Sequence, residues 1–207
     1  MESPAKPGHD ARYAAALRRF DEANARDPNA LRVDGTTQPR ELVHARWLTD
    51  WVLKLDPAAS EVLRLAARCQ HLCRWEIPRD AYPMTRPGYL RWRAELKKLH
   101  AQKAGEILTA VGYDAETIRR VQALNLKKNF PHDPESRVLE DALCLVFLER
   151  QLEELAQKTE EAKVLNALQK SWAKMTPAAH TLALQLEFSH RAKDLLARAL
   201  AADEGCD

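Results

Sequence analysis

The stretch "ELVHARWLTDWVLKL" (residues 41–55) carries the clearest helical pattern near the start of the chain. Leu48, Trp51 and Leu55 recur at intervals of three and four residues, which is the spacing of one face of an α-helix. His44 lies four residues before Leu48 on that same face. The sequence therefore predicts a helix with a buried face, and we expect His44 to point into the core.

Helical signals dominate the rest of the chain as well. An Asp or Thr directly before Pro supplies a capping oxygen and then a residue whose φ suits a first helical turn. Such pairs occur at Asp27-Pro28, Asp56-Pro57, Asp133-Pro134 and Thr176-Pro177. The predicted helices cover about residues 10–26, 39–55, 57–74, 87–110, 114–127, 134–158, 160–174 and 177–201. No convincing strand pattern appears, so we expect an all-α bundle of about eight helices with one long irregular loop near 75–89.

Chain length and composition favour one domain. The chain has 207 residues, of which 45% are apolar, enough for a single helical domain over 1–207. Within it, the C-terminal helices of 151–207 are amphipathic and are expected to pack on the core or on a partner subunit, as in a homo-oligomer. The last residues, which include Cys206, are expected to form an exposed tail.

Charge and motif content argue against several classes of protein. The 32 basic and 30 acidic side chains give a net charge of +2, which offers no support for a nucleic-acid or membrane-surface partner. No apolar run is long enough to cross a bilayer, and the start "MESPAKPGHD" lacks a signal core. Neither GxGxxG nor GxxxxGK[ST] occurs. We therefore expect a cytoplasmic protein without a nucleotide-binding loop.

The segment "CQHLC" (69–73) raises the question of a metal site or a redox pair. On a helix, Cys69 and Cys73 share a face with Leu65, whereas His71 points to another side. One metal could not then be held by all three residues. A disulfide is also disfavoured in a reducing cytoplasm. We predict that both thiols are small buried core residues.

Two inward histidines and one inward carboxylate suggest a metal centre. Asp141 lies in "VLEDALCLVFLE", which is apolar nearly all round and so typical of a central helix. An ionised carboxylate is costly there unless a cation or several donors meet it. Together with His44 and His71 it would suit one divalent ion: Mn, Fe, Co, Ni or Zn. The alternative is a neutral His44 and a His–Asp pair within the core.

The irregular loop and its surroundings suggest a site for an anion. Five arginines and no lysine occur between residues 74 and 93, together with two tryptophans and two tyrosines. Arginine binds phosphate or carboxylate with two parallel hydrogen bonds. We predict that Arg74, Arg79 and Arg91, assisted by Lys127, bind the anionic group of a small metabolite. The alternative is a loop whose arginines stack on its own aromatic rings.

A family resemblance supports the metal hypothesis. "ELVHARW" (41–47), "LAARCQHL" (65–72) and "VLEDALCLV" (138–146) resemble the HD-domain metal-dependent phosphohydrolases. The resemblance implies an HD-like helical bundle and metal ligands at His44, His71 and Asp141, with Arg46 close to the substrate. Where that family has an Asp after the second His, this chain has Leu72.

A second resemblance covers more of the chain. "HARW", "HLCRWEIPR", "GYLRWR" and "VLEDALCLVFLE" are similar to a bacterial and fungal family known as a domain of unknown function. Members of that family have carried a glutamyl-tRNA synthetase label. This sequence has neither the HIGH-like nor the KMSKS-like signature of such an enzyme.

These observations give three hypotheses for the function. The first is a metal-dependent hydrolase of a small phosphorylated or anionic metabolite. The second is an Fe(II)-dependent oxygenase, because two histidines and one carboxylate are the ligands of such enzymes. The third is a non-catalytic HD-like domain that binds a ligand or a protein. His100, which shares a flank with Leu96 and Ala104, is a candidate fourth ligand or else an interfacial histidine.

Overall fold

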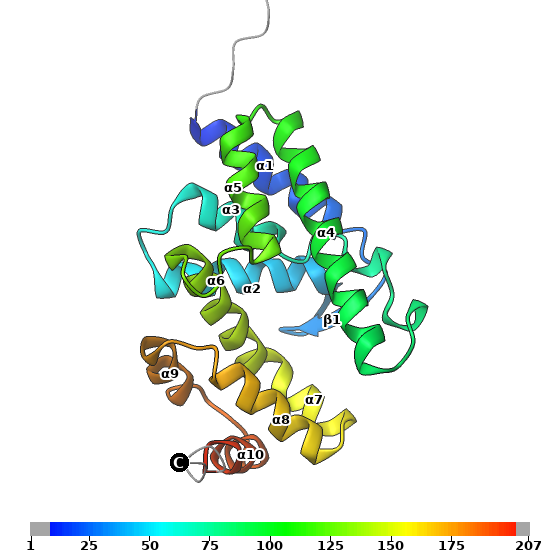
Figure 1. Ribbon diagram of the computed structural model, residues 1–207, viewed down its shortest axis with the longest axis vertical. Helices are drawn as coiled ribbons and strands as arrows, with labels where there is room; N and C mark the ends of the chain where they lie inside the picture. The colour runs from blue at the N-terminus through cyan, green and yellow to red at the C-terminus, as the bar shows by residue number, and fades with distance from the viewer. Residues whose placement is uncertain (1–8, 202–207) are drawn as a thin grey trace, which may run out of the picture. The chain divides into compact units, whose positions relative to one another are not determined.

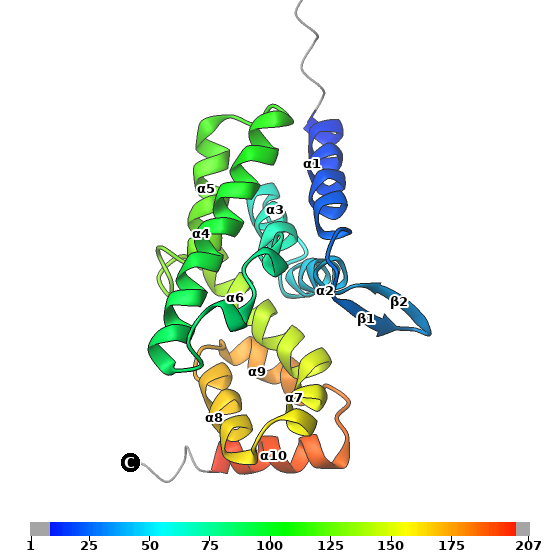
Figure 2. The same ribbon diagram turned by 90° about the vertical axis from the view of Figure 1, so that its right-hand side faces the viewer.

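The computed structural model describes residues 9–201 (Figures 1 and 2). Within those residues the chain forms ten α-helices and one short two-stranded sheet, which confirms the all-α prediction. No helix in this range is long and apolar enough to cross a membrane. The chain divides into two compact units between Ser136 and Arg137, and each unit is described by itself. Cys206 lies outside the described residues.

The first unit is a helical bundle with a small hairpin. Its elements are α1 (His9–Asn24), β1 (Ala30–Val33), β2 (Thr36–Pro39), α2 (Arg40–Leu55), α3 (Glu61–Cys69), the short 3-10 turns η1 (Arg74–Glu76) and η2 (Arg79–Ala81), α4 (Arg86–Ala110) and α5 (Ala115–Leu126). Helices α4 and α5 run side by side, and α3 packs against both α2 and α5 (Figure 2). Fully buried leucines from these helices, among them Leu48, Leu63 and Leu124, form the core.

The hairpin is an element that the sequence prediction missed. Strands β1 and β2 pair antiparallel, with Val33 opposite Thr36. Between them lie Asp34 and Gly35, both with positive φ (48° and 77°). Such φ values at both central residues are those of a type I′ turn, for which Asp-Gly is a preferred sequence. The dipeptide was therefore the signal, and the strands were too short to show alternation.

Helix α3 is shorter at both ends than the predicted 57–74. It begins at Glu61 because the Ser60 hydroxyl accepts a hydrogen bond from the backbone N–H of Leu63, which is an N-cap. It ends at Cys69, and the chain then turns through Cys73, whose φ of 56° is left-handed. His71 consequently lies in a turn and not on a helix, so the helical spacing used to place its side chain does not apply.

The second unit holds the remaining helices. They are α6 (Pro134–Val146), which begins just before the division, the π-helical turn η3 (Phe147–Gln151), α7 (Leu152–Lys158), α8 (Glu161–Trp172), α9 (Pro177–Leu184) and α10 (His190–Ala201). The predicted single helix over 177–201 is wrong, because it breaks between α9 and α10. Ser189 begins the second piece, since its hydroxyl accepts from the N–H of Ala192.

Candidate metal centre

Three side chains of the first unit meet at the start of α2. Glu41 and His44 lie three residues apart on α2 and therefore share a face, and both are buried. His71 reaches them from the turn after α3, and its ring stacks on that of His44 with 4.4 Å between centroids. One ligand atom from each of the three residues lies within 4.8 Å of the others. The structure thus brings together two of the predicted ligands, His44 and His71, with Glu41, which was not among the predicted ligands.

Two buried polar residues hold the backbone around this group. The Asp27 carboxylate accepts a hydrogen bond of 2.9 Å from the N–H of Glu41, in the first turn of α2. Asn24, which has no exposed surface, donates to the carbonyl of Glu41 at 3.4 Å and accepts from the N–H of Cys73 at 3.1 Å. Asn24 therefore ties the start of α2 to the turn that carries His71.

His100 lies beside the group on α4. Its ring centroid is 5.8 Å from that of His71, and its Nδ1 makes a 2.7 Å hydrogen bond to the carbonyl of Leu72. A carbonyl oxygen can only accept, so Nδ1 carries the proton and Nε2 presents a lone pair. That Nε2 is buried without a hydrogen-bond partner. A carbonyl that fixes one imidazole nitrogen is the usual support for a metal ligand at the other.

Other buried polar atoms of the group also lack hydrogen bonds. They are Nδ1 of His44 and Oε2 of Glu41, although Nδ1 of His71 lies 3.5 Å from the latter. An unsatisfied buried polar atom is costly and calls for a partner. Because the donors are imidazole nitrogens and a carboxylate oxygen, they suit a divalent ion of the Mn, Fe, Co, Ni or Zn type. The Glu41, His44 and His71 group could hold such an ion.

The protonation of the histidines also suits a metal. Burial lowers the pKa of His44 to about 3, and the neighbouring His71 adds to the effect. Burial likewise lowers the pKa of His100 to about 4 and that of His71 well below its usual value. All three are therefore neutral near pH 7, which is the form that binds metals. Burial raises the pKa of Glu41, because the loss of solvent around the carboxylate outweighs the opposing effects of His44 and Arg74.

This protonation pattern predicts that the metal-free protein loses stability in acid. Between about pH 6.5 and 4 the unfolded chain binds more protons than the folded one, because His44 and His100 have lowered pKa values in the fold. Each histidine should reduce the free energy of unfolding by about 2 kcal/mol at pH 5 relative to pH 7. Glu41, with its raised pKa, partly offsets this loss. Urea unfolding at pH 5 and pH 7 in the presence of chelator measures the loss in free energy of unfolding. The variant His44→Gln should show a weaker dependence of stability on pH. An equal stability at pH 5 and pH 7 would contradict it.

Asp141 is buried, as predicted, but its oxygens have other partners. In the second unit it accepts hydrogen bonds from both the N–H (2.9 Å) and the hydroxyl (2.6 Å) of Thr176, the residue that caps α9. These donors account for a carboxylate on an apolar helix without any cation. The group of three described above contains Glu41 as its carboxylate, and the assignment of Asp141 as a ligand stays a prediction.

The cysteines of "CQHLC" are core residues, as predicted. Cys69 and Cys73 are buried free thiols, and Asn125 donates to the sulfur of Cys69 at 3.1 Å. Burial raises the pKa of Cys69 to about 12 and that of Cys73 to about 11, so neither is a thiolate near pH 7. Leu72 between them is fully buried. The candidate group of Glu41, His44 and His71 therefore offers only oxygen and nitrogen donors.

A cleft of about 440 Å³ reaches Glu41 from the surface. Three arginines, two carboxylates and two tryptophans are among its lining residues: Arg40, Arg74, Arg79, Glu41, Asp80, Trp75 and Trp92. The Arg74 guanidinium lies 3.7 Å from Oε1 of Glu41 and stacks over the Trp92 ring at 4.9 Å from its centroid. The cleft thus joins arginines and aromatic rings to the metal group.

The other predicted substrate-binding residues differ in their surroundings. Arg79 donates to the carbonyls of Tyr82 and Pro83, both at 3.0 Å, so it also holds the loop together. Arg46 is exposed and donates to Gln38 of the hairpin, while Arg91 is exposed on α4; neither lines the cleft. Lys127 lies close enough to His71 for its charge to add to the effects of burial and Arg74 on the pKa of that histidine. Their roles in substrate binding stay predictions.

Glu41 is the residue that the sequence interpretation missed. A glutamate in the first turn of a helix is usually explained by the helix dipole. The available signal was the spacing Glu-x-x-His at 41–44, because a carboxylate and a histidine three residues apart on one helix form a common half of metal sites in helical bundles.

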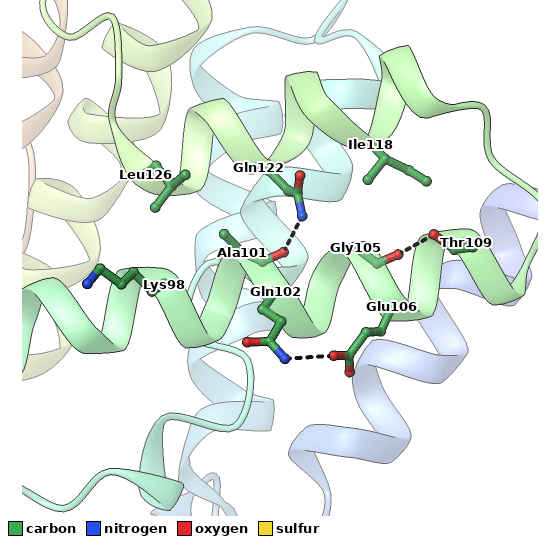
Figure 3. A pocket seen from close by; sticks show the side chains of 9 residues that line it. All are labelled: Lys98, Ala101, Gln102, Gly105, Glu106, Thr109, Ile118, Gln122 and Leu126. Carbon is green, nitrogen blue, oxygen red and sulfur yellow. Dashed lines mark hydrogen bonds between the residues drawn. The ribbon is translucent and has the colours of Figure 1, made fainter.

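A second hollow lies along α4 and α5 (Figure 3). Its polar side chains bond to one another or to the backbone: Gln122 donates to the carbonyl of Ala101 and Gln102 donates to Glu106, each at 2.9 Å. Gln122 and Gln102 therefore have hydrogen-bond partners within the hollow. The cleft beside Glu41 is the better candidate site.

Comparison with known proteins places the chain in a family. No curated protein and no solved structure matches it. Residues 14–196 match the family described as "Domain of unknown function (DUF4202)", as the resemblance of "HARW" and "VLEDALCLVFLE" led us to expect of an uncharacterised family. Because the match covers most of the sequence, the chain belongs to this family.

Proposed function

We propose that this protein is a divalent-metal-dependent hydrolase that acts on a small phosphorylated or otherwise anionic metabolite. The observation that carries the proposal is the contact between a buried metal-type group and a cleft lined by arginines. Glu41 belongs to both, since one of its oxygens faces His71 and the other faces Arg74. A substrate anion in the cleft would therefore lie beside the metal.

In this proposal, some residues of the chain would bind the metal ion and others would bind the substrate. Glu41, His44 and His71 hold the ion, and His100 is the candidate fourth donor through its unpartnered Nε2. When bound, a divalent ion supplies a Lewis acid that lowers the pKa of water and polarises a phosphoryl oxygen. Arg74 and Arg40 orient the substrate anion and neutralise the charge that develops on it.

The similarity to HD-domain phosphohydrolases belongs to this proposal. The order of His44 and His71 along the chain follows the pattern of that family, and Leu72 departs from it. We propose that Glu41 provides the carboxylate that this chain lacks at position 72. The similarity thus supports metal-dependent hydrolysis in which the two histidines keep their places and the carboxylate comes from α2.

Phosphate release tests the proposal. Protein stripped with chelator should hydrolyse at least one member of a panel of phosphorylated metabolites only after Mn²⁺, Co²⁺, Ni²⁺ or Zn²⁺ is restored. His71→Gln removes a ligand of the ion and should lower the rate about a hundredfold or more, since changes in residues that only support ligands already cost ten- to a hundredfold. His132→Gln, which alters an exposed histidine, is the matched control and should keep the wild-type rate. Metal binding without any turnover of the panel would contradict hydrolysis and favour a non-catalytic binding domain.

The ligand set itself favours a second candidate. Two histidines and one carboxylate are the donors of non-haem Fe(II) oxygenases, and Glu41, His44 and His71 are such a set. The same panel incubated with Fe²⁺ in an oxygen electrode separates the two functions. Oxygen uptake that depends on a panel member, without release of phosphate, would support the oxygenase.

A further inference from the structure

Arg74 and the histidines compete for one carboxylate. Nε of Arg74 lies 3.7 Å from Oε1 of Glu41, and Nδ1 of His71 lies 3.5 Å from Oε2. An ion held by the histidines and Oε2 would therefore share Glu41 with a guanidinium. Glu41 is the one carboxylate in the group of Glu41, His44 and His71, so the ion and Arg74 would draw on the same acidic side chain.

Arg74 is held in this position by its neighbours. Its guanidinium stacks over the Trp92 ring, and the indole N–H of Trp92 donates to the carbonyl of Ile77 at 2.8 Å. A ring fixed in this way keeps the charge that stacks on it in place. Arg74 can therefore move away from an incoming cation only by giving up its contacts with both Trp92 and Glu41.

Positive charge also prevails in the wider surroundings. Arg40 and Arg74 line the cleft, and Arg93 and Lys127 lie within electrostatic range of His71. Asp27 and Asp80 oppose them, but Asp27 already accepts hydrogen bonds from Asn29 and from the N–H of Glu41. A divalent cation alone would add two further positive charges, whereas an oxyanion on Arg74 would offset them.

We propose that the site binds its metal ion and an oxyanion with positive coupling, so that tight metal binding requires an anion on Arg74. This inference rests on the proposed function, in which Glu41, His44 and His71 hold the ion. It adds that the affinity for the ion depends on whether an anion is bound to Arg74. Coupling of binding is reciprocal, so the ion should raise the affinity for the anion by the same factor.

Titration of Co²⁺ into chelator-stripped protein, with and without inorganic phosphate, tests the inference. Calorimetry gives the affinity, corrected for the complex of Co²⁺ with phosphate, and the visible absorption of Co²⁺ reports a change in its ligands. We expect phosphate to lower the Kd for Co²⁺ about tenfold or more in the wild type. In Arg74→Gln, Co²⁺ should bind more tightly without phosphate, and phosphate should change the Kd less than about threefold.

The controls separate the possible failures. Arg119→Gln removes an exposed arginine of α5 and should keep the full coupling. If Arg74→Gln does not fold, the variant Arg74→Met is used in its place, because methionine keeps an apolar stem over Trp92. An equal Kd with and without phosphate, or full coupling in the Arg74 variants, would overturn the inference. Absence of Co²⁺ binding would overturn it and the proposed function together, whereas coupled binding without hydrolysis would overturn only the hydrolase.

Discussion

Replacing Glu41 with glutamine is expected to weaken the binding of divalent metal by about a hundredfold or more. Glutamine keeps the size of the side chain but replaces a charged oxygen donor by a neutral one, and Glu41 is the only carboxylate in the group with His44 and His71. Changes in residues that merely support ligands already cost ten- to a hundredfold in metal affinity. Calorimetric titration of Mn²⁺ or Zn²⁺ into the stripped variant and the wild type measures the loss.

The same variant should still fold, with a moderate loss of stability. Burial disfavours the charged form of Glu41, so a neutral amide removes a desolvation cost while it gives up the ion pair with Arg74. We expect the free energy of unfolding of the metal-free protein to fall by about 1–3 kcal/mol, because the largely buried Arg74 loses its charged partner. Glu95→Gln, at an exposed glutamate paired with Lys98, is the matched control. Wild-type metal affinity in Glu41→Gln would remove Glu41 from the site.

Leu72→Asp is expected to destabilise the protein by about 4 kcal/mol or more, and often to prevent folding. Leu72 has no exposed surface, so the change leaves a cavity and buries a carboxylate that has no partner. The change would also disturb the turn that contains Leu72, whose backbone carbonyl accepts a hydrogen bond from His100. Thermal and urea unfolding with and without Mn²⁺ should show the same loss in both conditions.

Leu72→Met provides the control for this experiment. Methionine has a similar volume, so we expect a loss below about 1.5 kcal/mol and metal binding close to that of the wild type. If Mn²⁺ instead restores the stability of Leu72→Asp, the new carboxylate reaches the ion. Position 72 would then belong to the site, as in the HD-domain pattern.

The sequence was most informative where a local rule decides the structure. Helical spacing placed His44 on the buried face of α2, and the Asp-Pro and Thr-Pro pairs at 133 and 176 do begin helices. The same rule misled at Asp56, which ends α2 instead of starting the next helix. A capping residue followed by proline shows that a helix boundary is near, whereas the packing on either side decides which boundary it is.

The candidate site was predictable only in part, because distant contacts decide the rest. Helical spacing over 57–74 failed at His71, since the chain leaves the helix after Cys69 and the N–H of Cys73 binds Asn24. Asp141 was correctly placed inside, but its donors come from Thr176, which lies 35 residues further along the chain. Single-residue patterns report burial well, whereas the identity of the buried partner depends on tertiary structure.

The order of the candidate donors along the chain has a consequence for folding during translation. Glu41, His44 and His71, together with Asn24 and His100, all belong to the first unit, which ends at Ser136. Residues up to Ser136 are synthesised before residues 137–207, and N-terminal units generally fold first. The three residues that could hold a metal ion therefore leave the ribosome before the second unit, so the candidate group can form while synthesis continues.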